Sequence, residues 1–396
     1  MASSEQCYDL SFSTQFNSLF SMPFSFPIQP NSLSSLPSSW ADLSEDLLEL
    51  IFKDLTDFFD LLRCKTICHS WRSATKKVII QNIKIPLLLI PSTKTKSQEY
   101  AKLLSTTNQS QSTTTTKLYT IHSPKRLART CCQSSYHGWL LMADIGDPSR
   151  VYLYNPISRF HVQLPLLPPE REYPTPLRFM MTCSPDDPNC SILVLFDYLG
   201  SHNGCVCKPG DNKWRKNVVN MGSYEDMIYY NGELYAIDKY GTLKKLKYGG
   251  GGGGGEDFFE EEEVAAREVD WNAAWIYLVE SDSGDLVMVV RQVMSLTTTV
   301  SFKAFKLNWG KGVWEEVNNF GDRALLLAHN DSVFVHVGNL YKPNCIYFVD
   351  DFWVGDHNSH TYDYGVYELG NHKIEMIYPS EQMVFGASFY RWFNLH

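Results

Sequence analysis

From Lys117 to Pro379 the chain is a series of short β-type runs separated by turn residues. The runs are rich in Val, Ile, Tyr, Phe and Trp, which favour strands. Between them lie turn sequences such as Asn155-Pro156 and Asn231-Gly232. No long helical pattern interrupts the series, although parallel strands would need crossover helices. The pattern therefore predicts antiparallel sheets.

The β-type runs also recur in similar units. Several units contain an apolar strand, a turn and then a strand with an aromatic residue, such as Phe160, Trp214 or Trp314. A recurrence of roughly 40–50 residues is typical of propeller blades. We therefore expect a β-propeller of five or six blades over residues 118–385. A β-sandwich is the competing fold; it is less favoured because no strand order suggests Greek-key crossings and the length is high for one sandwich.

The stretch from Trp40 to Lys77 has a helical spacing instead. Its first apolar residues recur at steps of four, one, three, one and three: Leu43, Leu47, Leu48, Ile51, Phe52 and Leu55. This spacing forms one face of a helix. Ser44 can cap that helix, and Glu45 and Asp46 place carboxylates in its first turn, where the helix dipole favours negative charge.

Two further short helices are expected in the same stretch. Asp57 would cap a second helix carrying Phe58, Phe59, Leu61 and Leu62. A third would carry Ile67, Cys68 and Trp71 and end with the basic residues Arg72, Lys76 and Lys77. Large apolar side chains contribute roughly 1.5–3 kcal/mol each when buried, and a unit of about 38 residues has too little interior to hide them all. Part of this surface should therefore be covered, either by another domain of the chain or by a second protein.

The sequence LSEDLLELIFKDL, followed by LLRCKTICHSWRSA, resembles an F-box. This three-helix motif docks on the Skp-type adaptor of cullin-based ubiquitin ligases. The family usually has proline after the first leucine, whereas this chain has Ser44, which keeps a capping side chain but lacks the fixed dihedral angle. The resemblance implies that the adaptor is bound by Leu43, Leu47, Leu48, Ile51, Phe52, Leu55, Leu61, Leu62, Cys64, Cys68 and Trp71.

A second resemblance extends over roughly residues 40 to 385. HGWLLMAD, YNPISRFHVQLP and the segment from Cys345 to Pro379 are similar to a plant family that combines an F-box with an all-β, kelch-like domain. The resemblance implies a substrate-recognition subunit of an SCF-type ubiquitin ligase, in which the β domain captures an unidentified protein target. Such a subunit makes no bond itself and works in the cytoplasm, the nucleus or both. The alternative is a ligand-binding or enzymatic propeller in which the helical unit is only a docking domain.

These features predict an organisation that is α+β by domain. Residues 1–36, rich in Ser, Phe and Pro, would form a disordered leader, residues 37–79 the three-helix unit, and residues 80–117 a strand followed by a flexible, low-complexity linker. The strand is expected from Val78 to Pro91. Within the mainly antiparallel propeller, residues 249–263 combine seven glycines with an acidic run and are expected to form a flexible surface loop.

Charge and hydropathy exclude several classes of function. A net charge of −9 and a pI near 5.7 argue against general binding of nucleic acid. The local basic groups are expected to be solvated faces: Lys125, Arg126, Arg129, Lys244, Lys245 and Lys247. No apolar run approaches the length that spans a bilayer, so we expect no membrane partner. The ten cysteines follow no framework and are interpreted as reduced thiols.

We expect no catalytic, cofactor or metal site. The chain contains no GxSxG, HExxH or GxGxxG motif in the required context. His202, Cys205 and Cys207 lack a second pair of zinc ligands. The densest polar group could supply metal ligands or an acid/base pair, but turn residues at the rim of a sheet explain it as well. It consists of Asp350, Asp351, Asp356, His357 and His360.

Overall fold

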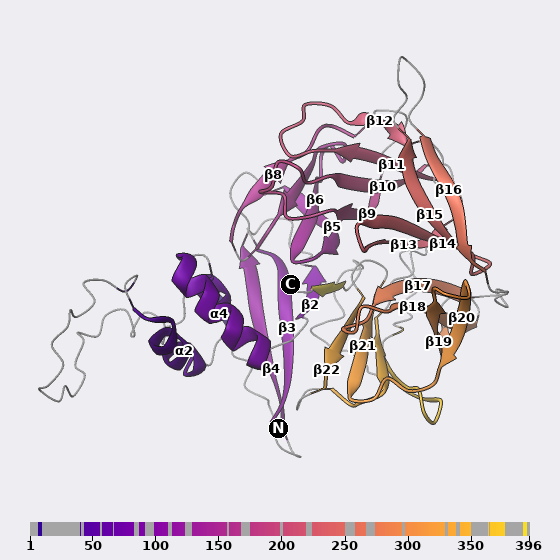
Figure 1. Cartoon of the computed structure of the whole chain (residues 1–396). Helices are drawn as coiled ribbons and strands as arrows, with labels where there is room; N and C mark the ends of the chain where they lie inside the picture. Colours follow the sequence, from indigo (N-terminus) through magenta and orange to yellow (C-terminus); the bar gives the residue numbers. More distant parts are fainter. Residues whose placement is uncertain are drawn as a thin grey trace, which may run out of the picture.

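A small helical unit lies beside a ring of β-sheets in the computed structural model of this chain (Figure 1). The structure describes residues 7–9, 40, 43–55, 58–65, 67–82, 87–91, 99–109, 113–122, 129–156, 158–167, 175–198, 201–218, 224–249, 258–266, 274–294, 298–328, 332–337, 341–349, 363, 365–376 and 391–393. Within these residues the predicted β-propeller is confirmed, and the competing sandwich is wrong.

The helical spacing of the N-terminal stretch is matched by α2 (Glu45–Lys53), α3 (Phe58–Cys64) and α4 (His69–Asn82). Ser44 stands at the N-cap of α2, but the expected side-chain capping bond is not formed. Asp57 lies outside the described residues. The helix α4 continues past Lys77, so Val78 is helical and the strand predicted from Val78 is wrong in its first part. Because Val78 packs into the helical core, tertiary burial favours the helix over the strand tendency of this apolar run.

Five blades are formed by consecutive segments of the chain. The first contains β5 (Thr130–Tyr136), β6 (Trp139–Asp144), β7 (Val151–Tyr154) and β8 (His161–Gln163). The second contains β9 (Thr175–Met181), β10 (Ile192–Tyr198), β11 (Ser201–Cys207) and β12 (Arg215–Val218). The third contains β13 (Tyr224–Tyr230), β14 (Glu233–Asp238), β15 (Leu243–Gly249) and β16 (Phe258–Ala265). The fourth contains β17 (Ala274–Glu280), β18 (Leu286–Met294), β19 (Thr298–Asn308) and β20 (Val313–Val317). The fifth contains β21 (Arg323–Leu327), β22 (Val333–His336), β23 (Cys345–Phe348), β24 (Gly365–Glu368) and β25 (Lys373–Met376).

The first four blades are antiparallel meanders, as predicted, and the fifth departs from this pattern. Its strand order is β22-β21-β23-β24-β25, and β21 pairs with β23 in parallel. A strand has therefore been added on the inner side of this blade. The description "mainly antiparallel" holds for the propeller as a whole.

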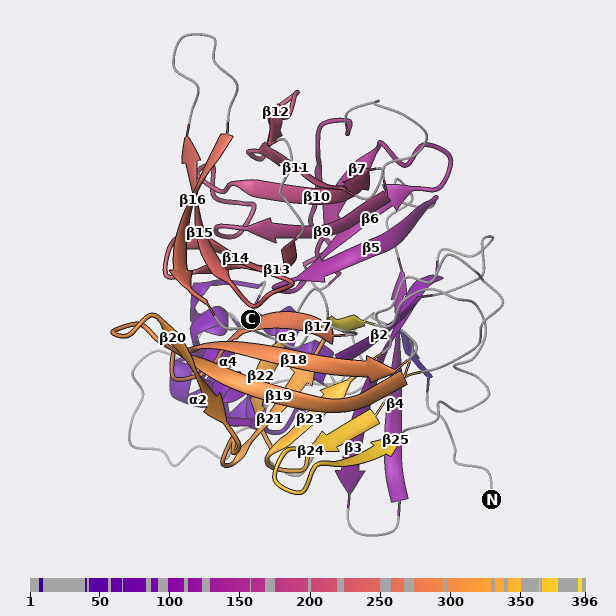
Figure 2. The same ribbon diagram turned by 90° about the vertical axis from the view of Figure 1, so that its right-hand side faces the viewer.

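A further sheet, here called the closing sheet, joins both ends of the chain in the order β1-β4-β3-β2-β26. Its strands are β1 (Cys7–Asp9), β2 (Leu87–Pro91), β3 (Glu99–Gln109), β4 (Thr113–His122) and β26 (Arg391–Phe393). The strand β26 lies next to β5, and the innermost strands β5, β9, β13, β17 and β22 then follow one another (Figure 2). Pairing of β2 with β26 thus connects the two ends of the propeller region.

Three segments predicted to lack regular structure contain strands. Much of the linker 92–117 forms β3 and β4, and Cys7–Asp9 of the leader pairs with β4; the rest of the leader lies outside the described residues. The β-branched threonines at 113–116 favour a strand once a partner is present. The acidic end of the 249–263 insertion belongs to β16, because its glutamates face the lysines of β15.

Two buried ion pairs connect neighbouring blades. Arg178 of β9 donates to the carboxylate of Asp226 on β13, and the same carboxylate accepts the backbone N–H of Leu278 on β17 at 2.7 Å. Farther along, Arg291 donates to Asp363 at 2.9 Å and its guanidinium lies 5.0 Å from the ring of Phe348. Both pairs are almost completely buried. The blades are therefore joined by buried charges as well as by apolar packing.

Candidate docking surface on the helical unit

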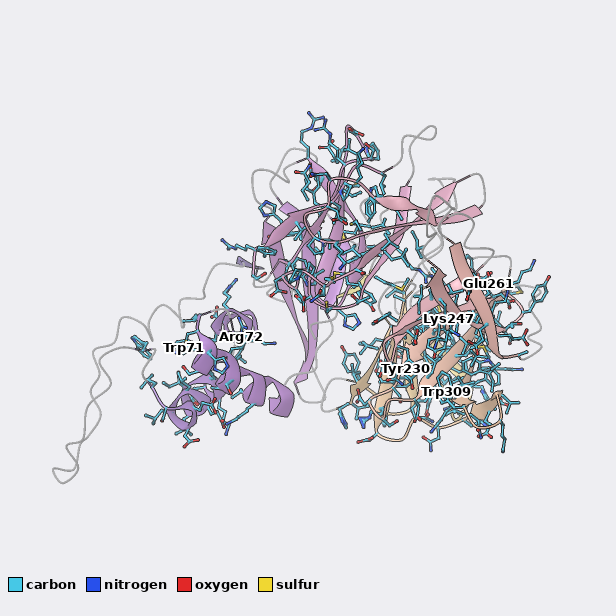
Figure 3. All side chains as sticks on the ribbon, turned by 45° about the horizontal axis from the view of Figure 1, so that its top comes forward. Trp71, Arg72, Tyr230, Lys247, Glu261 and Trp309 are labelled. Atoms are coloured by element: carbon cyan, nitrogen blue, oxygen red, sulfur yellow. The ribbon has the colours of Figure 1, made fainter. Side chains whose placement is uncertain are left out.

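The three helices share one small apolar core. It consists of Leu43, Leu48, Phe52, Leu55, Leu61, Cys64, Trp71, Ala74 and Val78. Trp71 of α4 (labelled in Figure 3) lies at its centre, with its ring centroid 5.1 Å from that of Phe52 in an edge-on arrangement. Its indole N–H donates to the carbonyl of Trp40 at 3.0 Å, so the polar atom of this buried ring is satisfied. The core fixes α2 against α4.

Charged groups support the same packing from outside. Lys77 of α4 contacts the carboxylates of Glu45 at 2.8 Å and Glu49 at 3.0 Å on α2. The hydrogen bond to Lys77 lowers the pKa of Glu45, and hydrogen bonds to Glu45 and Glu49 raise the pKa of Lys77. These groups are open to solvent, so the pairs contribute little to stability. They fix the register of the two helices more than they stabilise the unit.

One buried carboxylate belongs to α3. Asp60 is fully buried and accepts a hydrogen bond from Arg63 at 2.8 Å, one turn later on the same helix. Nearby, burial raises the pKa of the Cys64 thiol, which keeps it neutral and makes it a core residue. Neither residue is available at the surface for chemistry.

Apolar side chains remain exposed on the outside of this unit. Leu47 is 40% exposed, Leu50 is 61% exposed and Ile67 is 44% exposed. Leu47, Leu50 and the half-buried Ile51 are three and four residues apart on α2, so they lie on one side of that helix. Ile67 lies in the turn between α3 and α4. We call Leu47, Leu50, Ile51 and Ile67 the docking surface.

The predicted contact residues divide into four groups. Seven are buried in the helical core: Leu43, Leu48, Phe52, Leu55, Leu61, Cys64 and Trp71. Leu47 is exposed, and Ile51 and Cys68 are half-buried. Leu62 lies in α3, but its side chain is outside the described residues. We expected that a unit of this size could not hide all its apolar residues, and most of the predicted contact residues are in fact buried. Contact with the adaptor stays a prediction for all of them.

Sequence reasoning left Leu50 out of the contact set and used Ile67 only as a helix residue. Leu50 lies beside the apolar stripe that identified α2, so the stripe gave no reason to include it. Leu50 could have been found as a contact residue because it is a leucine outside the core-facing stripe of an amphipathic helix. Ile67 offered no comparable signal, because its exposure depends on where the turn between α3 and α4 places it.

The other candidate sites are described only in part. The polar group from Asp350 to His360 lies outside the described residues. Among the residues that the structure describes, no three His, Cys, Asp or Glu side chains are grouped to hold a metal ion.

Lys244 and Lys247 pair with Glu261 and Glu262 at 2.8 and 2.6 Å, and Lys245 pairs with Glu233 at 2.9 Å. The basic run on β15 is thus a neutralised surface; Lys247 and Glu261 are labelled in Figure 3. None of the described helices has both the length and the apolar character needed to span a bilayer.

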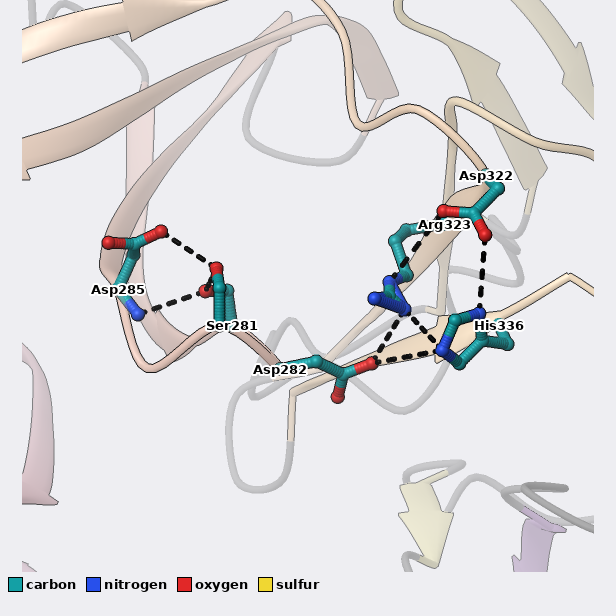
Figure 4. A network of polar contacts seen from close by, with 7 residues as sticks. Ser281, Asp282, Asp285, Asp322, Arg323 and His336 are labelled. Carbon is teal, nitrogen blue, oxygen red and sulfur yellow. Dashed lines mark hydrogen bonds and ion pairs between the residues drawn. The ribbon is translucent and has the colours of Figure 1, made fainter. Parts of the chain in front are cut away.

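A polar network at the joint of the fourth and fifth blades is shown in Figure 4. Arg323 donates to Asp282 at 2.9 Å and lies 2.6 Å from the Nε2 atom of His336. Because a guanidinium can only donate, that nitrogen must accept, and the imidazole proton then sits on Nδ1, 3.4 Å from Asp322. The arrangement is a structural link between the β17–β18 turn and β21–β22, in which Arg323 lies between the carboxylates of Asp282 and Asp322.

Comparison with known proteins finds plant proteins that are similar to this chain over most of its length. Probable F-box protein At4g22165 of Arabidopsis thaliana is 24% identical over 90% of this chain and 96% of its own length. Putative F-box protein At4g22170 is also 24% identical, over 90% of this chain and 96% of its own length. The crystal structure of AofleA from Arthrobotrys oligospora aligns with 60% of this chain and 70% of its own, at 11% identity and a TM-score of only 0.33.

The resemblance to plant F-box proteins with a β-propeller is thereby confirmed. The model of the KIB1-4 beta-propeller family matches residues 107–368, which include the end of β3, all of β4 and the five consecutive blades as far as β24. Because this match covers well over half of the sequence, the chain belongs to the KIB1-4 beta-propeller family.

Proposed function

We propose that this protein is the substrate-recognition subunit of an SCF-type ubiquitin ligase. The helical unit is a three-helix F-box that binds a Skp-type adaptor and, through it, a cullin. The propeller captures a protein target and brings it near the ubiquitin-conjugating enzyme, which raises the effective concentration of the target. The subunit itself is non-catalytic and works in the cytoplasm, the nucleus or both.

One observation carries the proposal: the helical unit has a complete core of its own and still exposes apolar side chains on α2. Leu47 and Leu50 are 40% and 61% exposed although Leu48, between them, is fully buried. Exposed apolar side chains gathered on one helix are typical of a surface that a partner covers. The names of the two relatives above, both F-box proteins, support a Skp-type adaptor as that partner.

The proposed contact set is narrower than the F-box resemblance implied. A side chain in the helical core, such as Leu48 or Trp71, positions α2 and α4 but has no surface to offer. The docking surface of Leu47, Leu50, Ile51 and Ile67 is open to contact. Full burial of a leucine contributes about 1.5–3 kcal/mol. A micromolar Kd corresponds to a binding free energy of about 8 kcal/mol, so covering these partly exposed residues supplies a useful part of it.

Co-purification from plant extract tests the proposal. The double variant Leu47→Asp/Leu50→Asp places two charges where the partner would exclude water, so recovery of the Skp-type adaptor and cullin should fall at least about tenfold. Both positions are exposed in the free protein, so the helices should remain folded.

Leu166→Asp is the matched control, because Leu166 is an equally exposed leucine, 58% exposed, on the propeller. It should leave adaptor recovery unchanged. Undiminished recovery with Leu47→Asp/Leu50→Asp, together with an unchanged circular dichroism spectrum, would contradict the proposed docking.

A further inference from the structure

The loop between β9 and β10 of the second blade contains two cysteines at its two ends. Cys183 follows β9 and is exposed, whereas Cys190 precedes β10 and is fully buried in the core between the first two blades. Both are free thiols. The six residues between them, Ser184 to Asn189, form a tight loop at one end of the blade.

The strand register places the two cysteines opposite each other. Met181 pairs with Ile192, and the next pair is joined by the N–H of Thr182, which donates to the carbonyl of Ser191 at 3.1 Å. One step farther, Cys183 faces Cys190. Directly opposed residues in antiparallel strands have Cα atoms about 4.5–5.5 Å apart, which falls within the range of about 4.4–6.8 Å found in disulfides.

The side chain of Cys190 is turned toward its partner. Its thiol donates to the carbonyl oxygen of Cys183 at 3.0 Å. The loop is held in this shape without a covalent link, because Asp187 donates its N–H to Ser184 and accepts that of Cys190, both at 3.0 Å. A bond between the sulfurs would therefore need a side-chain rotation and little backbone movement.

We propose that Cys183 and Cys190 form a reversible disulfide, a redox-responsive modification site on the propeller with glutathione disulfide as oxidant. The site is separate from the docking surface and goes beyond the proposed function. Closing it would lock the loop Ser184 to Asn189 and remove the one exposed thiol at this end of the blade from further oxidation.

The reaction occurs in two exchange steps. The thiolate of the exposed Cys183 attacks one sulfur of glutathione disulfide, which forms a mixed disulfide and releases one glutathione thiolate. The thiol of Cys190 then gives up its proton and attacks the Cys183 sulfur, which forms the protein disulfide and releases the second glutathione as a thiolate that takes up a proton. In sum, two protein thiols are oxidised and one glutathione disulfide is reduced to two glutathiones.

The second step depends on the thiolate form of Cys190. Burial raises the pKa of the Cys190 thiol to about 11, so only a small fraction is thiolate at neutral pH. Well below that pKa, the rate of the second step should rise about tenfold for each pH unit, in proportion to the thiolate.

The test uses the full-length protein in glutathione buffers that range from fully reduced to fully oxidised. After free thiols are blocked by alkylation, peptide mass spectrometry should detect a Cys183–Cys190 link that increases with the oxidised fraction and disappears on return to reduced glutathione. Cys190→Ala should instead retain glutathione on Cys183, since the resolving thiol is missing. Cys183→Ser should leave Cys190 unmodified, because the buried thiol is out of reach of the oxidant.

Cys131→Ser is the matched control: Cys131 is also exposed but lies in the first blade, and the link should form as in the unaltered protein. The proposal is overturned if Cys183 becomes glutathionylated in the unaltered protein and no link to Cys190 follows at any ratio or pH. It is equally overturned if Cys183 links to another cysteine in preference to Cys190.

Discussion

The helical unit and the propeller are stabilised in different ways. The helices depend on one apolar core formed by residues close in sequence, with a buried ion pair, Asp60–Arg63, inside a single helix and the pairs of Lys77 at the surface. The propeller combines apolar packing between blades with buried ion pairs between residues far apart in sequence, such as Arg178 with Asp226. A unit held by local contacts can keep its shape while one side remains open to a partner. The stability of a ring held by long-range contacts depends on every blade being in place.

The largest expected effect comes from breaking a buried charge pair in the propeller. Asp226→Ala leaves Arg178 without its carboxylate and removes the acceptor of the Leu278 and Met227 N–H groups. Loss of one partner of a buried pair costs about 3–5 kcal/mol. Denaturant unfolding followed by the propeller tryptophans should show a drop of this size, while adaptor binding by the helices persists.

The exposed pair Asp147–Arg150 is the control for that measurement. Arg150→Ala breaks a 2.9 Å contact at the surface and should change the free energy of unfolding by less than about 1 kcal/mol. Equal effects of the two substitutions would show that the buried pair contributes no more to the stability of the propeller than an exposed one.

A core truncation in the helices should act on them alone. Leu48 is fully buried in the helical core, and Leu48→Ala should destabilise this unit by about 2–5 kcal/mol through lost burial and the cavity left behind. Limited proteolysis should cut within residues 43–82 while the propeller stays intact. If the propeller became equally sensitive, the two regions would be one cooperative unit and the comparison would fail.

A smaller effect is expected where two strands of the fifth blade approach closely. A Cβ atom added at Gly365 would lie 2.7 Å from the ring of Phe348 and 2.8 Å from the carbonyl of Glu375. Gly365→Ala should therefore cost about 1–3 kcal/mol through overpacking.

The control needs a glycine with free space and an ordinary backbone angle. Gly210 and Gly232 have free space but positive φ angles, so alanine would be strained there and they are unsuitable controls. The open, negative-φ comparison is Gly310→Ala, whose nearest neighbour would be 3.6 Å away. Thermal unfolding should distinguish Gly365→Ala from Gly310→Ala.

The smallest effect concerns Lys77 and the two glutamates of α2. The folded-state pKa of Glu45 is lowered by its hydrogen bond to Lys77, so this contribution to stability is present above the carboxyl pKa of the unfolded chain. It is lost as the pH falls through the lower, folded-state pKa. Lys77→Met should remove that acid-side dependence with little change at neutral pH. An unchanged acid dependence of helix unfolding would show that the pair is not formed in solution.

The sequence predicted what depends on local pattern. The steps between Leu43 and Leu55 indicated α2, and Asn231-Gly232 indicated a hairpin turn whose residues indeed have positive φ angles of 49° and 80°. The propeller followed from repetition of such hairpins. The end of α4 and the strands β3 and β4 were missed because their conformation depends on packing and pairing partners distant in sequence.

The surface could be predicted only in part. Leu47 and Leu48 are adjacent and chemically identical, yet Leu48 is fully buried and Leu47 is open. That difference depends on where α4 lies against α2, which no periodicity of α2 alone reports. Likewise, nothing local marked Arg178 and Asp226 as partners, since they belong to different blades.

The central claim is that the exposed side of α2 is where the adaptor binds. Calorimetric titration of the full-length protein with a purified plant Skp-type adaptor tests it most directly. The account predicts saturable binding by the unaltered protein and by Leu166→Asp, with the Kd of Leu47→Asp/Leu50→Asp raised at least about a hundredfold. An unaltered Kd in that double variant, with its helices folded, would contradict the account.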